Sequence, residues 1–149
     1  MKILNYLSYF TLLVAAGLVA LSGYWLIFPY KPIEVKSMVV STTQVESGGV
    51  LIYDVDYCKP APIKASITRS FVNGIIFTTN TVFGDAPTGC HKNSVYIQVP
   101  QELTSGEYSL RVTWSYKVNP IREIAITRDS NRFTIVGSDI DRQAEQENN

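Results

Sequence analysis

YSLRVTWSYKV, residues 108–118, is the stretch of this 149-residue chain that decides its fold. Apolar and polar side chains alternate along its whole length. Alternation with a period of two is typical of a β-strand with one buried and one solvent-exposed face, because successive side chains point to opposite sides of a strand. The apolar positions are Tyr108, Leu110, Val112, Trp114, Tyr116 and Val118.

Two further stretches alternate in the same way. The second apolar set occupies Leu51–Tyr57 and the third Val95–Val99. About seven to eight short strands, at intervals of about 8–12 residues, predict an all-β antiparallel sandwich over residues 31–137. The remaining strands are expected near residues 33–45, 63–71, 75–83, 121–128 and 132–137.

Three short sequences are typical of turns between these strands. Gly48-Gly49 separates the first two strands. Asn73-Gly74 lies between apolar pairs and predicts a hairpin of type I′, a turn that needs positive φ at both central residues. Asp129-Ser130-Asn131 predicts the last hairpin.

The segment that leads into the 108–118 strand carries a recurring pattern. Pro100, Leu103, Gly106, Tyr108 and Leu110 have the spacing P-x-x-L-x-x-G-x-Y-x-L. This spacing resembles the loop that enters a central strand in immunoglobulin-like and fibronectin-type sandwiches. The resemblance implies an immunoglobulin-like sandwich. A true immunoglobulin domain, however, places a tryptophan between its two cysteines, and here the tryptophan of the 108–118 strand follows both of them.

An uncharged apolar segment precedes the β region. Residues 3–28 contain no charged side chain, and 26 residues exceed the roughly 20 that cross a hydrocarbon core. Tyrosine and tryptophan residues near both ends suit the two interfacial belts of a membrane. Pro29 and Pro32 are expected to end the helix. The sequence therefore predicts a transmembrane signal-anchor over residues 1–30.

Two questions about this segment stay open. Ala20 and Ser22 precede Gly23 in an A-x-A-like arrangement, so a cleaved signal peptide is the rival interpretation. The orientation is weakly determined by charge, because Lys2 stands on one side and Lys31 on the other.

The two cysteines, Cys58 and Cys90, both follow the apolar segment. An even pair in a membrane-targeted chain predicts a disulfide in an oxidising compartment, and two unrelated buried thiols are the alternative. We therefore expect a cytoplasmic N-terminus and a periplasmic or extracellular domain. Because Cys58 is out of phase with the Leu51–Tyr57 set, a peripheral bridge is expected, which joins the loop 84–93 to a strand end.

The chain as a whole is similar to uncharacterised small membrane-anchored proteins of tailed phages and bacteria. The shared features are the anchor, the Gly89-Cys90 pair, the G-x-Y strand and Val118-Asn119-Pro120. This resemblance implies no particular activity. Residues 138–149 are predicted to form a flexible acidic tail.

The composition argues against several classes of function. Lys+Arg and Asp+Glu both total 13, and this balance argues against nucleic-acid binding. The single histidine, His91, is adjacent to Cys90, but neighbours on an extended chain point to opposite sides. We therefore expect no enzyme and no cofactor. Asp54 and Asp56 share a strand face and could bind a cation with Asp85, although a solvated face is the favoured interpretation.

The hypothesis that these observations favour is a non-enzymatic interaction module, displayed outside the membrane to a protein partner at the membrane or cell envelope. Its contact surface is expected on loops 59–62 and 84–93. The alternative is a structural subunit of an envelope or virion complex, in which Ala16 and Ala20 pack against other helices. A metal- or small-ligand-binding domain is a remote alternative. The expected contact residues are Lys59, Pro60, Asp85, His91, Lys92 and Tyr96.

Overall fold

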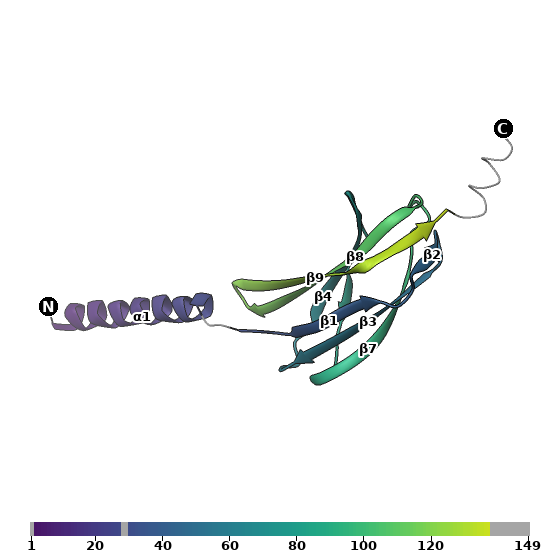
Figure 1. Cartoon of the computed structure of the whole chain (residues 1–149). Coiled ribbons are helices and arrows are strands. Elements are labelled where there is room, and N and C mark those ends of the chain that lie inside the picture. Colours follow the sequence, from purple (N-terminus) through teal and green to yellow (C-terminus); the bar gives the residue numbers. More distant parts are fainter. Residues whose placement is uncertain (1, 28–29, 138–149) are drawn as a thin grey trace, which may run out of the picture.

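The computed structural model describes residues 2–27 and 30–137 (Figure 1). The predicted acidic tail, residues 138–149, and the expected helix stop at Pro29 lie outside these residues. The described chain consists of one helix followed by nine strands. They are α1 (Lys2–Ile27), β1 (Glu34–Val40), β2 (Gln44–Glu46), β3 (Val50–Lys59), β4 (Ala65–Asn73), β5 (Ile75–Thr78), β6 (Val82–Gly84), β7 (Gly89–Gln98), β8 (Gly106–Asn119) and β9 (Arg122–Val136).

Helix α1 is the predicted apolar segment. Tyr6–Ile27 is long and apolar enough to cross a membrane, with 22 residues and a mean hydropathy of 2.0. None of its most apolar stretch is buried against the rest of the protein. The domain therefore leaves the apolar surface of this helix uncovered.

The strands form two sheets, and the prediction of a mostly β protein is confirmed. One sheet has the order β1-β3-β7, and the other has the order β2-β9-β8-β4-β5, with β6 paired to β4. The prediction of purely antiparallel pairing is wrong at one place, because β2 runs parallel to β9. After β1 the chain crosses from the first sheet to the second. There β2 runs in the same direction as β9.

The alternating side chains meet in a shared core between the sheets. Leu51, Tyr53, Val55 and Tyr57 of β3 are all buried, and so are the alternate residues of β8 from Tyr108 to Tyr116. The alternate residues of β8 therefore line the side of the core that the second sheet forms. Figure 1 shows β3 and β8 in different layers of the domain.

The strand expected over residues 33–45 is two strands in different sheets. β1 pairs with β3 and ends at Val40, whereas β2 begins at Gln44 beside β9. The main chain of Val40 bonds to the side chain of Asn131 in β9. The chain crosses from one sheet to the other just after this contact.

The hairpin predicted at Asp129-Ser130-Asn131 is wrong, because these residues lie inside β9. Their side chains bond to neighbouring strands instead of closing a turn. Asp129 pairs with Arg111, and the Ser130 hydroxyl accepts the N–H of Leu110 at 2.9 Å. The register of β8 on β9 shifts here between Ser109 and Arg111, because β9 has one extra residue, which is accommodated as a bulge.

The hairpin predicted at Asn73-Gly74 joins β4 to β5. Gly74 has a φ of 68°, but no non-glycine residue among those described has positive φ, so the turn is not of type I′. In the loop before β8, the hydroxyl of Tyr108 donates to the carbonyl of Thr104 at 3.0 Å, and Leu103 is buried. This bond holds the loop against the start of β8.

Candidate functional site

The predicted disulfide between Cys58 and Cys90 is confirmed. The two residues stand directly opposite each other on β3 and β7, so the bond joins neighbouring strands of one sheet. The expected loop 84–93 is partly wrong, because its second half is the start of β7 at Gly89. Since the sulfur of Cys90 is bonded to Cys58, it is not a thiolate, and the Cys90–His91 pair has no nucleophile.

Several of the predicted contact residues share the surface of the β1-β3-β7 sheet that faces away from the core, which we call the outer face. Asp54 pairs with Ser94, and Asp56 pairs with Lys92. Tyr96 follows two residues after Ser94, is 67% exposed, and therefore points to the same side. The outer face thus combines two carboxylates, an exposed lysine and an exposed tyrosine (Asp54, Asp56, Lys92 and Tyr96).

Asp54 is the most highly bonded group of the outer face. The hydroxyl of Ser94 donates to its Oδ1 at 2.5 Å, and the hydroxyl of Ser41 donates to its Oδ2 at 2.8 Å. These two bonds, that from Ser94 first, lower the pKa of the Asp54 carboxyl. Ser94 belongs to β7, Asp54 to β3, and Ser41 directly follows β1. The two bonds therefore link the three strands of this sheet around one carboxylate.

The remote cation site of Asp54, Asp56 and Asp85 is not assembled. Asp85 lies in the segment before β7 and forms an ion pair with Lys59 at 3.4 Å. Within residues 2–27 and 30–137, no group of three histidine, cysteine or acidic side chains is arranged to hold a metal ion. Asp54 and Asp56 themselves are partly exposed on the outer face.

Lys59 does not belong to the exposed surface. Its side chain is only 1% exposed, and its ammonium group donates to the carbonyl of Ala86 at 2.6 Å. Because it is the last residue of β3, it ties this strand to the segment between β6 and β7. Of the neighbouring predicted contact residues, Pro60 and Asp85 are exposed.

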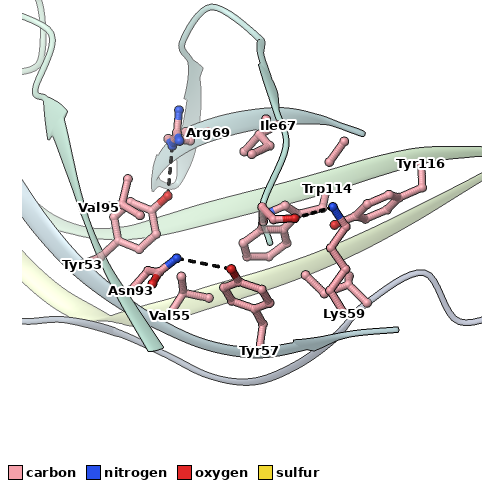
Figure 2. A pocket seen from close by; sticks show the side chains of 14 residues that line it. Tyr53, Val55, Tyr57, Lys59, Ile67, Arg69, Asn93, Val95, Trp114 and Tyr116 are labelled. Atoms are coloured by element: carbon pink, nitrogen blue, oxygen red, sulfur yellow. Dashed lines mark hydrogen bonds between the residues drawn. The ribbon is translucent and has the colours of Figure 1, made fainter. Parts of the chain in front are cut away.

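A small pocket opens between the two sheets beside Lys59 (Figure 2). Tyr53 and Tyr57 reach into it from β3, and Trp114 and Tyr116 reach into it from β8. Its volume is about 100 Å³, well below the roughly 300 Å³ at which sites for small organic molecules begin. The pocket is therefore a feature of core packing at the open edge of the sheets.

Two phenols of this pocket, those of Tyr57 and Tyr116, are held in their neutral form. Tyr53 accepts a bond from Arg69 Nε at 3.1 Å, and Tyr57 accepts one from the Asn93 amide at 3.3 Å. Burial raises the pKa of Tyr57, and burial followed by the proximity of Tyr57 raises the pKa of Tyr116 to about 12. Neither phenol is prepared to lose a proton near neutral pH.

His91 lies on the inner side of β7. Its Nε2 is 2.8 Å from the carbonyl of Thr88, and its ring lies 6.0 Å from the ring of Tyr57, centre to centre. These contacts make it part of the corner next to the disulfide. It is separated from Lys92 and Tyr96, which point outward.

Two surface features were not expected from the sequence. Exposed apolar side chains gather on β5 and β6, where Phe83 is 85% exposed and Ile75 is 81% exposed. The end of the β8–β9 hairpin contacts the end of α1 through Asn119 and Arg122. Only Val118-Asn119-Pro120, a turn-forming sequence after a long alternating stretch, could have indicated this second feature.

No protein-family model matches the chain, and no curated protein matches its sequence.

Proposed function

We propose that this protein is a single-pass, membrane-anchored, non-enzymatic interaction module. The observation that carries the proposal is the apolar helix Tyr6–Ile27, of which nothing in the most apolar stretch is buried. Exposing so many apolar side chains to water is unfavourable at about 25 cal/mol per Å². A lipid bilayer removes this cost, and the adjacent β domain then stays tethered at the membrane surface.

The displayed domain is proposed to be immunoglobulin-like. The orders β9-β8-β4-β5 and β1-β3-β7 support this proposal, because they correspond to G-F-C-C′ and A-B-E in immunoglobulin domains of the variable type, although among the described residues the second sheet has three strands and that fold has four. The bond from Tyr108 to the Thr104 carbonyl is that of a tyrosine corner, a feature of the same fold. The disulfide within one sheet, Cys58–Cys90, departs from the inter-sheet bridge of antibody domains.

The domain is proposed to lie on the periplasmic or extracellular side, with the N-terminus in the cytoplasm. The support is the Cys58–Cys90 disulfide, because structural disulfides persist in oxidising compartments and are rare in the cytosol.

The contact surface for a protein partner is proposed on the outer face, with Tyr96 and Lys92 of the edge strand β7 as its main contact residues. Tyrosine is enriched among the residues that dominate binding energy, and Tyr96 is exposed on a rigid strand. Its strand β7 is held in place by the disulfide at one end and by the full length of β3. Two expected contact residues, Lys59 and His91, are left out of this surface, because Lys59 is buried and His91 points inward.

An anchor exchange tests this proposal against the structural-subunit alternative. Residues 1–27 are replaced by an unrelated transmembrane helix, and the full chain is extracted from its native membrane and captured. The interaction module predicts that the partner captured with the natural chain is retained after the exchange and is lost on Tyr96→Ala. Loss of the partner on anchor exchange, with Tyr96→Ala having no effect, would favour the structural subunit.

A further inference from the structure

The end of the β8–β9 hairpin is bonded to the last turn of α1. Asn119 Nδ2 donates to the carbonyl of Trp25 at 3.0 Å, and Arg122 donates to the carbonyl of Leu26 at 3.1 Å. The last four carbonyls of a helix have no partner within the helix, so these two bonds satisfy acceptors that would otherwise need water. In Figure 1 the end of this hairpin points toward the end of α1.

Electrostatics favours the same contact. The last turn of α1 contains no basic residue, although a positive charge at a helix C-terminus is stabilised by the helix dipole. Arg122 supplies this charge from the domain. The hairpin is itself shaped for the contact, because the N–H of Ile121 donates to Asn119 Oδ1 at 3.1 Å and closes the turn.

These bonds fix the depth of the hairpin relative to the apolar helix. Trp25 and Leu26 lie inside the candidate membrane span Tyr6–Ile27. A group within hydrogen-bond distance of their carbonyls therefore lies where the hydrocarbon core meets the headgroups. The exposed side chains of Pro120 and Ile121, the latter 53% exposed, are at this level.

The surroundings of the hairpin end suit this level of a bilayer. A groove of about 230 Å³ separates the hairpin from the helix and is lined by Tyr24, Trp25 and Tyr30. Tyrosine and tryptophan are enriched at the headgroup level of membranes. The tether is also short, since only four residues separate Ile27 from the buried Pro32.

We propose that the β8–β9 hairpin end, residues 119–122, docks on the lipid surface, with Ile121 in contact with the headgroup and upper acyl region. The proposal rests on the membrane anchoring proposed above. It adds that the domain has a defined orientation on the bilayer. β8 runs toward the membrane from Gly106 to Asn119, and the β4–β5 turn lies beside its start, at the end of the domain far from the bilayer.

Paramagnetic broadening of isoleucine methyl signals tests the docking. The full chain is placed in phosphatidylcholine nanodiscs containing a lipid with a gadolinium chelate on its headgroup. Ile75 is the matched control, because it is also exposed and follows the turn beside Ser109. Ser109 and Asn119 are ten residues apart on β8, about 33 Å at about 3.3 Å per residue. The proposal predicts loss of the Ile121 signal and retention of the Ile75 signal.

Two variants and one control separate the possible failures. Asn119→Ala combined with Arg122→Ala removes the bonds to the Trp25 and Leu26 carbonyls and is expected to restore part of the Ile121 signal. Arg128→Ala, on the same strand but bonded to the neighbouring Thr127 carbonyl, is expected to change nothing. Equal broadening of Ile121 and Ile75 in chains that have entered the nanodiscs would overturn the docking alone. Failure of the chain to enter the nanodiscs would overturn the anchoring and the docking together.

Discussion

The side-chain amide of Asn131 forms two hydrogen bonds with the main chain of Val40. The N–H of Val40 donates to Asn131 Oδ1 at 2.7 Å, and Asn131 Nδ2 donates to the Val40 carbonyl at 3.1 Å. Asn131 belongs to β9 and Val40 to β1, so this amide takes the place of a strand neighbour and links the two sheets where the chain passes between them.

Asn131→Ala should therefore destabilise the protein. It leaves the partly buried N–H and C=O of Val40 without these partners, which costs about 1–3 kcal/mol in the free energy of unfolding. Denaturant unfolding of the full chain in detergent micelles measures this loss. Asn80→Ala, at an exposed asparagine, is the control and should change the stability by less than about 0.5 kcal/mol. Equal stability of the two variants would contradict the linking role of Asn131.

The disulfide should contribute a large share of the stability. Cys58 and Cys90 are separated by 32 positions, and closing such a loop stabilises a fold by roughly 3–4 kcal/mol on the chain-entropy model. Cys58→Ala combined with Cys90→Ala is expected to lose about this amount, as measured by unfolding without reductant. Added reductant should lower the stability of the natural chain and leave that of the double variant unchanged. A natural chain that is insensitive to reductant under unfolding conditions would argue against the bond.

Lys59 should respond differently to two substitutions. Lys59→Met keeps the length of the side chain and removes a buried charge, so we expect stability within about 1 kcal/mol of the natural protein, or above it. Lys59→Ala enlarges the neighbouring pocket and should cost about 2–4 kcal/mol. Measuring the free energies of unfolding of both variants separates the contribution of packing from that of the buried ammonium group. A Met variant as unstable as the Ala variant would show that the bond to the Ala86 carbonyl outweighs packing.

Asp54 should make the stability depend on pH in the acid range. Its pKa in the folded protein lies below the ordinary value of 3.8, so the carboxylate stabilises the fold above that value. This contribution is lost as the pH falls through the lowered pKa. The difference in free energy of unfolding between the natural protein and Asp54→Asn should therefore be constant above about pH 5 and shrink at lower pH. Ser94→Ala should raise the Asp54 pKa, as followed by NMR titration; an unchanged pKa would rule out the Ser94 hydroxyl as its main cause.

The regular part of the fold was predictable because burial imposes a period that is visible in the sequence. The alternation over residues 108–118 and Leu51–Tyr57 predicted the two strands that supply nine of the 20 buried apolar residues of the core. The disulfide followed from having two cysteines beyond an apolar segment. The strand predictions depend on residues that are close together in the sequence, and the disulfide prediction depends on the number of cysteines.

The remaining features depend on partners far away in sequence. Asp129, Ser130 and Asn131 have the composition of a turn, but Arg111, Leu110 and Val40 bond to them and keep β9 continuous. Lys59 was expected at the surface because lysine is rarely buried, and its burial depends on two distant partners, the Ala86 carbonyl and the Asp85 carboxylate. Within the candidate site, Tyr96 is out of phase with the apolar set Val95–Val99 in the sequence, and it is exposed in the structure.

Photo-crosslinking in the native membrane tests the central claim most directly. A photoreactive amino acid is placed at position 96 on the outer face, and at position 127, an exposed position on the other sheet, as the control. The account predicts a discrete protein adduct from position 96, formed on the non-cytoplasmic side, and none from position 127. Adducts of equal yield from both positions, or no adduct from position 96, would contradict the proposal that this face is the displayed contact surface.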